Sequence, residues 1–207
     1  MHWAVAVTTA PRPKSTLERT LAGLRRTGWA EYRVFEDTTR AGAWRTWLAA
    51  LRELTTQQAD AYLICQDDAV FCRGLRNYLE KTLWPAGPVA LCSPYCPTPY
   101  KRTQCGWHEE NRGWNLVGAV CWTIPPESGK AILAALDHVE AERQVDARVG
   151  QWATETGRSV WYHTPSLVQH IGSGNSALGD PLVIDLRTAT DFIGEHSSAS
   201  QKAKDGD

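Results

Sequence analysis

Apolar and polar residues alternate over the first 85 residues in a pattern that predicts strands and helices in turn. Short apolar runs rich in Val, Ile, Tyr and Phe predict strands at residues 3–8, 32–36 and 61–65. Leu and Trp at helical spacing predict helices over residues 15–28, 42–55 and 73–83. This β-α-β-α-β-α order predicts an α/β fold, with a mixed, mostly parallel sheet flanked by helices.

The first predicted helix has its own start and stop signals. Ser15 and Glu18 have the spacing of a capping box, in which each side chain accepts a hydrogen bond from a backbone amide at the helix start. Gly28 follows the last leucine of the apolar stripe and is typical of a helix end.

The second half of the chain has a less regular pattern. Strands are predicted at 89–92, 115–124 and 160–163, and helices over 127–142 and from Asp146 to Thr156. Residues 93–114 and 164–176 are rich in turn-forming residues and are expected to be irregular. We expect one domain over residues 1–194 and a flexible tail over 195–207.

The composition is that of a globular protein without strong overall charge. The chain has 207 residues, of which 43% are hydrophobic, and 22 Lys and Arg balance 23 Asp and Glu. The sequence lacks an apolar run long enough to cross a membrane, and the net charge of −1 disfavours nucleic-acid binding driven by bulk charge. The residues after Met1 do not form a signal peptide, so we expect a cytoplasmic protein whose six cysteines stay reduced.

Polar residues follow all three strands of the first half. They are Thr8, Thr9 and Arg12, then Asp37, and then Gln66, Asp67 and Asp68. Ligands of open α/β sheets bind beyond the carboxyl ends of the strands, where these residues should meet. Arg12 is suited to a phosphate. Asp37 is suited to a ribose or base, or alternatively to a turn with Thr38.

Asp67 and Asp68 indicate a divalent metal ion. Adjacent carboxylates repel each other, and a buried carboxylate needs a cation or several hydrogen-bond donors. Mn²⁺ and Mg²⁺ prefer oxygen ligands and leave positions for a phosphate. A solvated turn after the strand is the competing interpretation.

Two residues of the second half are further candidates for the site. His170 lies in a loop next to Gly172, and its imidazole is a candidate second ligand for a cation on Asp68. Asp146 is either the cap of a helix or a general base that deprotonates an acceptor hydroxyl.

The cysteines allow a second metal site. Cys92, Cys96, Cys105 and His108 supply enough ligands for a tetrahedral structural zinc ion. The alternative is that these thiols are buried as small apolar side chains.

These residues resemble glycosyltransferases of the GT-A fold. Residues 66–68 resemble the Asp-x-Asp motif, whose last acid binds the metal, although Gln66 replaces the first acid. Residues 165–172 resemble a segment of the N-acetylglucosaminyltransferase IV family. Residues 115–125, which include Gly118, resemble the strand that lines the sugar, and Asp146 falls where many such enzymes place the acceptor-activating carboxylate.

The resemblance implies a single GT-A-like, Rossmann-like domain, with a nucleotide-binding half over 1–85 and an acceptor and catalytic half over 86–194. It implies a hexosyltransferase that moves a sugar from a UDP-sugar to an acceptor hydroxyl with inversion. Asp68 and His170 would hold Mn²⁺ or Mg²⁺, and Asp146 would be the base. The residues implied for nucleotide-sugar binding are Thr8, Thr9, Arg12, Asp37, Gln66, Asp67 and Gly118.

The acceptor is indicated less directly. We expect the protein to be without the signal anchor of Golgi members, which favours an enzyme of a bacterial or virus-infected cell. Compact relatives of this kind include phage TET-associated glycosyltransferases, so 5-hydroxymethylcytosine in DNA is one expected acceptor. The residues expected to contact the acceptor are Lys101, Arg102, Trp107 and Trp114.

Two other functions fit the same residues. A zinc-stabilised nucleic-acid-binding module would use the Cys/His cluster and the basic excess of residues 1–54. A metal-dependent phosphoesterase would use Asp67 and Asp68 without any acceptor.

Overall fold

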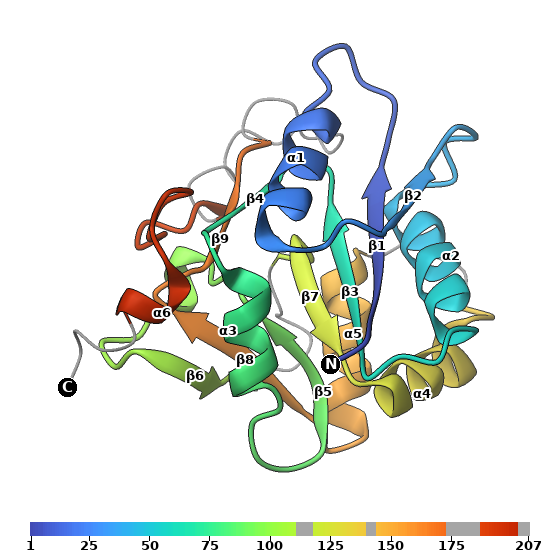
Figure 1. The fold of residues 1–207 in the computed structure, drawn as a ribbon. Helices are drawn as coiled ribbons and strands as arrows, with labels where there is room; N and C mark the ends of the chain where they lie inside the picture. Colours follow the sequence, from blue (N-terminus) through green and yellow to red (C-terminus); the bar gives the residue numbers. More distant parts are fainter. Residues whose placement is uncertain (111–117, 140–143, 173–186, 203–207) are drawn as a thin grey trace.

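A seven-stranded mixed sheet forms the centre of the molecule (Figure 1). The computed structural model describes residues 1–110, 118–139, 144–172 and 187–202. The strand order is β2-β1-β3-β7-β5-β8-β6. The strands are β1 Trp3–Thr9, β2 Arg33–Glu36, β3 Ala61–Gln66, β5 Val89–Ser93, β6 Gly106–Glu109, β7 Cys121–Ile124 and β8 Ser159–Thr164.

Most strands of this sheet point the same way. β1 is parallel to β2 and β3, and β5 is parallel to β8, whereas β7 and β6 are antiparallel to their neighbours. The expected α/β fold with a mixed, mostly parallel sheet is confirmed. The carboxyl ends of β1 and β3 therefore meet at one edge, at the top of Figure 1.

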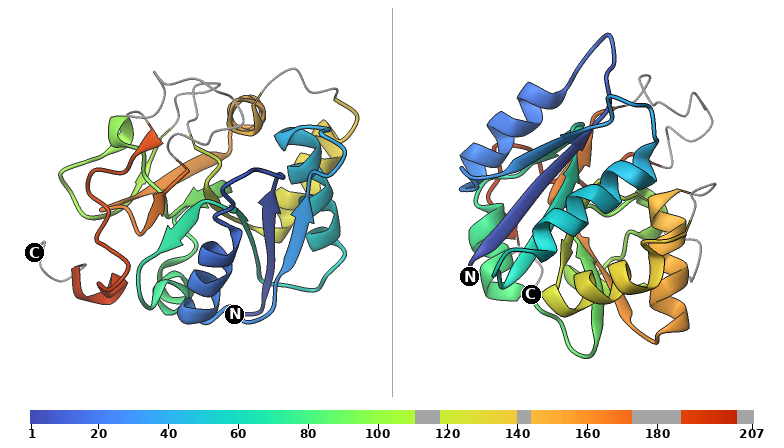
Figure 2. Two further views of the ribbon diagram at one scale, coloured as in Figure 1. Left: turned by 90° about the horizontal axis from the view of Figure 1, so that it is seen from above. Right: turned by 90° about the vertical axis from the view of Figure 1, so that its right-hand side faces the viewer.

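Helices cover both faces of the sheet. They are α1 Leu17–Thr27, α2 Ala43–Thr55, α3 Leu75–Thr82, α4 Pro126–Leu136, α5 Val145–Glu155 and α6 Ala199–Lys202, with a 3-10 turn at Thr98–Tyr100. The right-hand view of Figure 2 shows α1 on one side of the sheet and α4 and α5 on the other. No helix among the described residues combines the length and apolarity that crossing a membrane requires.

The alternation of side chains along the strands explains the two layers. In β1, Ala4 and Ala6 belong to the apolar core that includes α2, whereas Val5 and Val7 belong to the core that includes α1 and α3. Strand residues alternate between faces, so a strand that is buried on both faces needs apolar residues throughout. All seven residues of β1 are buried, which accounts for its continuous apolar run.

Several boundaries differ from the expected ones. The structure adds the strands β4 Ala69–Phe71, β6 and β9 Val168–His170, and β6 and β9 fall in segments expected to be irregular. β7 begins at Cys121, so the described residues 118–120 are not part of the strand, and residues 115–117 of the expected strand lie outside the described residues. α4 ends at Leu136, and residues 140–142 of the expected helix lie outside the described residues. The N-cap of α1 is Thr16, and the Ser15 hydroxyl accepts a hydrogen bond from the Leu17 amide, so the expected capping box is replaced by a local turn.

The segment expected to begin a flexible tail packs against the domain. Glu195 forms ion pairs with Arg19 and Arg26 of α1. The Arg73 amide donates to the Ser197 carbonyl at 2.9 Å, and Ala199 is buried. Residues 195–200 thus belong to the folded structure, and their contacts tie the chain to α1 and to the segment before α3.

Candidate functional site

A two-stranded ribbon brings two distant parts of the chain together at the carboxyl end of β3. β4 and β9 pair antiparallel, and Ala69 lies opposite His170. The Ile171 amide donates to the Asp68 carbonyl at 2.8 Å, which continues this pairing past the ribbon. As a result, His170 Nε2 lies 3.2 Å from Asp68 Oδ2, and the expected convergence of these two residues is present.

Hydrogen bonds on both sides hold the ribbon in place. The Thr20 hydroxyl of α1 lies 2.7 Å from the Asp67 carbonyl and 2.9 Å from the Ala69 carbonyl. The Gln169 side chain donates to the Ala189 carbonyl at 2.9 Å and accepts from the Ala189 amide at 3.0 Å. Because each strand of the ribbon is anchored separately, Asp68 and His170 are presented by supported backbone.

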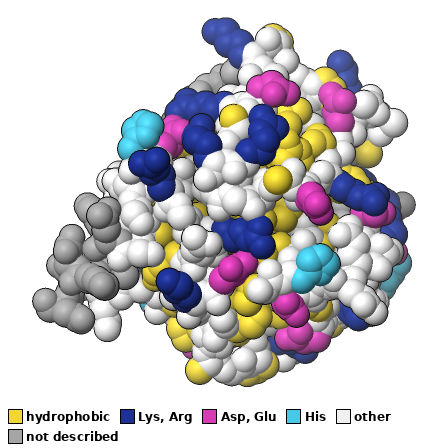
Figure 3. All heavy atoms as spheres, viewed as in Figure 1, with side chains coloured by type: hydrophobic (Ala, Val, Ile, Leu, Met, Phe, Trp, Pro, Cys, Tyr) yellow, Lys and Arg dark blue, Asp and Glu magenta, His cyan; other side chains and the backbone are white. Residues whose placement is uncertain are grey.

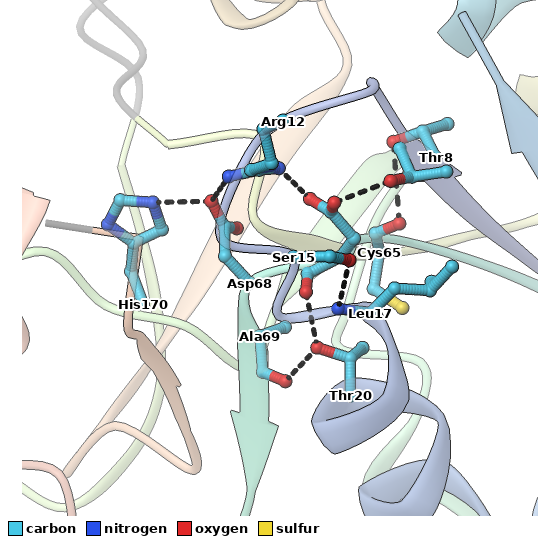
Figure 4. A network of polar contacts seen from close by, with 11 residues as sticks. Thr8, Arg12, Ser15, Leu17, Thr20, Cys65, Asp68, Ala69 and His170 are labelled. Carbon is cyan, nitrogen blue, oxygen red and sulfur yellow. Dashed lines mark hydrogen bonds and ion pairs between the residues drawn. The ribbon is translucent and has the colours of Figure 1, made fainter. Parts of the chain in front are cut away.

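The two acids have different surroundings. Asp67 is 1% exposed, accepts a hydrogen bond from the Thr9 hydroxyl at 2.5 Å and pairs with Arg12. Burial raises the pKa of Asp67. Burial would also raise the pKa of Asp68, but the hydrogen bond and charge of His170 and the charge of Arg12 bring it below its ordinary value. Figure 4 shows Arg12 and His170 both directed at Asp68.

Asp68 and His170 fit a divalent metal ion. Asp68 Oδ1 is buried and has no hydrogen-bond partner, although an unpartnered carboxylate oxygen is costly to bury. Two ligands at right angles on one Mg²⁺ ion stand about 3 Å apart, because each bond is about 2.1 Å long. The 3.2 Å between Oδ2 and Nε2 matches this separation. Among the described residues no three His, Cys, Asp or Glu side chains gather for a metal. Mg²⁺ commonly keeps water and phosphate oxygens as further ligands.

Gly172 keeps space free beside this pair, and it was not among the site residues expected from the sequence. A Cβ atom at position 172 would lie 2.3 Å from Asp68 Oδ2 and 2.9 Å from His170 Nε2. Both distances are too short for any side chain, so glycine is required while the pair holds this geometry. The signal in the sequence that could have pointed to Gly172 is its position two residues after His170.

The remaining strand-end residues make mainly structural contacts. The Thr8 hydroxyl donates to the Cys65 carbonyl at 3.4 Å, and the backbone amide of Gln66 donates to the Val120 carbonyl at 2.9 Å. The Asp37 carboxylate accepts the amides of Ala41 and Gly42 at 2.7 and 2.8 Å. These contacts agree with the interpretation of Asp37 as a turn residue, but its partners are Ala41 and Gly42 and not Thr38.

Asp146 and Gly118 are joined directly. Asp146 lies in the first turn of α5, and its Oδ2 accepts the Gly118 amide at 2.8 Å while Oδ1 accepts the Ala147 amide at 3.0 Å. Burial raises the pKa of Asp146. A Cβ atom on Gly118 would lie 2.6 Å from the ring of Tyr95. Burial raises the pKa of Tyr95 as well.

The fold is similar to that of solved glycosyltransferase structures. One is involved in glycosylation of the major capsid of PBCV-1, with a TM-score of 0.52, 10% identity, and coverage of 84% of this chain and 94% of that chain. Another is a variant of Drosophila β-1,4-galactosyltransferase 7 in complex with manganese, UDP-galactose and xylobiose, with a TM-score of 0.50, 12% identity, and coverage of 100% and 81%. The chain has the GT-A fold.

A third structure of this fold is A197 from STIV, with a TM-score of 0.52, 13% identity, and coverage of 95% of this chain and 99% of that chain. Neither a protein-family model nor a curated protein matches the sequence. At these identities the likeness establishes the fold.

The expected zinc site is not formed within this GT-A fold. Cys92 and Cys96 are buried, and Cys105 is exposed. Cys96 Sγ lies 3.8 Å from the Thr164 hydroxyl, and the His108 ring stacks against Tyr162. No three potential ligands gather among the described residues, so the structure does not support the expected zinc site. Burial raises the pKa of Cys96 to about 12, so this thiol is neutral and behaves as a small apolar group.

The residues expected to contact an acceptor are partly brought together. Arg102 and Trp107 line one pocket of about 320 Å³ at the outer edge of the GT-A sheet. Arg102 also pairs with the buried Glu110, and Trp107 Nε1 donates to the Thr82 hydroxyl at 3.1 Å. Lys101 is exposed, and Trp114 lies outside the described residues.

Proposed function

We propose that this protein is a metal-dependent glycosyltransferase of the hexosyltransferase type, which transfers a sugar from a nucleotide sugar, in particular a UDP-sugar, to an acceptor hydroxyl. The carrying observation is the Asp68–His170 pair, 3.2 Å apart, at the carboxyl end of β3 in a GT-A fold. Parallel α/β sheets bind nucleotides beyond this edge. A manganese and UDP-galactose complex of a protein with this fold supports the choice of ligands.

The donor would be held by residues from both halves of the chain. Asp68 and His170 would hold Mn²⁺ or Mg²⁺, which, when bound, neutralises the charge that develops on the diphosphate leaving group. Arg12 adds a guanidinium beside them for the same phosphates. Thr9 and Asp67 would hold Arg12 in position, because the Thr9 hydroxyl donates to Asp67 and Asp67 pairs with Arg12.

Asp146 would remove the proton from the acceptor hydroxyl. Each of its oxygens accepts one backbone amide, and a carboxylate oxygen has a second lone pair for another donor. The raised pKa of Asp146 makes this carboxylate a stronger base than an ordinary one. Attack by the deprotonated hydroxyl opposite the nucleotide would invert the anomeric carbon.

For the acceptor, we propose 5-hydroxymethylcytosine in DNA. Arg19, Arg25 and Arg26 are exposed along α1, and Lys and Arg side chains gather over the upper part of the face in Figure 3. Such a surface can contact a phosphate backbone, although Glu195 pairs with Arg19 and Arg26. A base with a hydroxymethyl group would have to leave the helical stack to reach a buried donor.

Titration with UDP-glucose, UDP-galactose and UDP-N-acetylglucosamine tests the donor site, with and without Mn²⁺. We expect at least one of them to bind about tenfold or more tightly with Mn²⁺, and Asp68→Asn to abolish this difference because it removes a charged ligand. A metal effect of equal size in Asp68→Asn would reject the assignment of Asp68.

Mass spectrometry of an oligonucleotide with 5-hydroxymethylcytosine, against a matched oligonucleotide with cytosine, tests the acceptor. A mass increase equal to the sugar of the donor on the first alone supports transfer to this base. Release of UMP and sugar 1-phosphate from the donor at the same rate with and without either oligonucleotide would favour a phosphoesterase instead.

A further inference from the structure

Arg12 supplies the positive charge that the two buried acids share. Its guanidinium pairs with Asp67 Oδ1 through Nη2, and Nη1 lies 3.6 Å from Asp68 Oδ2 (Figure 4). The side chain of Arg12 is 17% exposed, whereas Pro11, Pro13 and Lys14 around it are exposed. Arg12 therefore enters the site from the surface loop between β1 and α1.

The two ends of this bridge differ in strength. Asp67 is bound closely by Arg12 and also by the Thr9 hydroxyl at 2.5 Å. The contact of Arg12 with Asp68 is longer, at 3.6 Å, and Asp68 Oδ1 has no hydrogen-bond partner. A cation that binds Asp68 would therefore replace the weaker contact and leave the Asp67 pair intact.

We propose that Arg12 couples the binding of the metal ion to the binding of the diphosphate, an inference that rests on the proposed function. In the free protein, Arg12 contributes positive charge beside Asp68, whose carboxylate also contacts His170. When the ion binds to Asp68 and His170, Nη1 of Arg12 moves from Asp68 to the diphosphate, while Nη2 stays on Asp67. A planar guanidinium can hold two partners at once in this way, because its donors form a rigid fork.

This exchange predicts opposite effects on the two ligands when Arg12 is removed. When the metal ion binds without the diphosphate, it must displace the positively charged Arg12 from Asp68. Removal of Arg12 should therefore tighten the binding of the ion. The diphosphate should bind more weakly, because it loses a charge-assisted hydrogen bond. The factor by which each ligand improves the affinity of the other must be equal for both, and it should fall in the variant.

Isothermal titration calorimetry of Mn²⁺ with and without UDP, and of UDP with and without Mn²⁺, tests the coupling. For Arg12→Gln we expect the Kd of Mn²⁺ alone to fall about three- to tenfold and the Kd of UDP with saturating Mn²⁺ to rise about tenfold or more. Lys14→Gln is the matched control. It removes a positive charge from the same loop and should leave both constants within about twofold of the wild type, because Lys14 is exposed to screening solvent.

Unchanged or weaker binding of Mn²⁺ alone in Arg12→Gln would overturn the coupling, as would equal effects of Lys14→Gln. If Arg12→Gln does not fold, Arg12→Lys replaces it, since Lys keeps the charge but not the fork. A coupling factor at least about threefold below the wild type then supports the proposal, and an unchanged factor overturns it. A wild-type protein that binds neither Mn²⁺ nor UDP would instead reject the proposed function itself.

Discussion

Asp146→Asn is expected to lower the rate of sugar transfer by about 10²- to 10⁴-fold, the usual contribution of a general base. Asparagine has nearly the same shape and keeps a carbonyl oxygen to accept the Gly118 amide, which Asp146 Oδ2 accepts at 2.8 Å. Binding of UDP and Mn²⁺ should stay within about twofold of the wild type, because the substitution removes basicity and not a ligand. The measurement is single-turnover kinetics beside calorimetric titration.

The pH dependence gives Asp146 a separate signature. The base must be deprotonated, so the transfer rate should fall as the pH drops through the pKa of Asp146, which burial raises above the ordinary carboxyl value. Glu127→Gln is the control. Glu127 also lies in the first turn of a helix, but that helix is α4, which follows the antiparallel strand β7, so this variant should keep the pH dependence of the wild type. A rate of Asp146→Asn close to that of the wild type would exclude Asp146 as the base.

Gly172→Ala is expected to weaken Mn²⁺ binding about 10- to 100-fold, the size of effect seen when the support around metal ligands is disturbed. The added methyl group would lie 2.3 Å from Asp68 Oδ2 and 2.9 Å from His170 Nε2, so it must push the two ligands apart. Gly172 does not have the positive φ that would strain alanine itself. Mn²⁺ titration followed by electron paramagnetic resonance measures the loss.

Gly129→Ala is the matched control for this variant. Its added Cβ would lie 2.9 Å from the Tyr62 ring in the core beside α4, so it should reduce stability without reaching the metal ligands. If both variants lowered Mn²⁺ affinity equally, the effect of Gly172→Ala would reflect general destabilisation and not the pair. Thermal unfolding of both variants separates the two contributions.

Much of the fold was predictable because its signals are local. The buried strands β1 and β3 are continuous apolar runs, and α1 has its own apolar stripe and terminal Gly28. The ribbon of β4 and β9 was not predictable in the same way. Each of its strands has three residues, and their pairing joins positions about 100 residues apart, which periodicity within a short window does not detect.

The part of the site around Asp67 and Asp68 was predictable, because two adjacent acids after a buried strand are hard to explain by structure alone. Two adjacent acids after a buried strand indicated a cation, and the structure places His170 and Arg12 around Asp68. Residue spacing alone was misleading for zinc, because Cys92 lies on the core-facing strand β5 and Cys105 is exposed. Gly172 was missed because the need for glycine depends on where Asp68 and His170 lie in space.

Pulsed electron paramagnetic resonance of Mn²⁺ bound together with UDP tests most directly whether Asp68 and His170 bind one ion on a diphosphate. We expect a coupling to one imidazole nitrogen and a coupling to phosphorus, and we expect His170→Gln to lose the nitrogen coupling while a phosphorus coupling remains. A wild-type spectrum with a phosphorus coupling but no nitrogen coupling would contradict the assignment of His170 as a ligand.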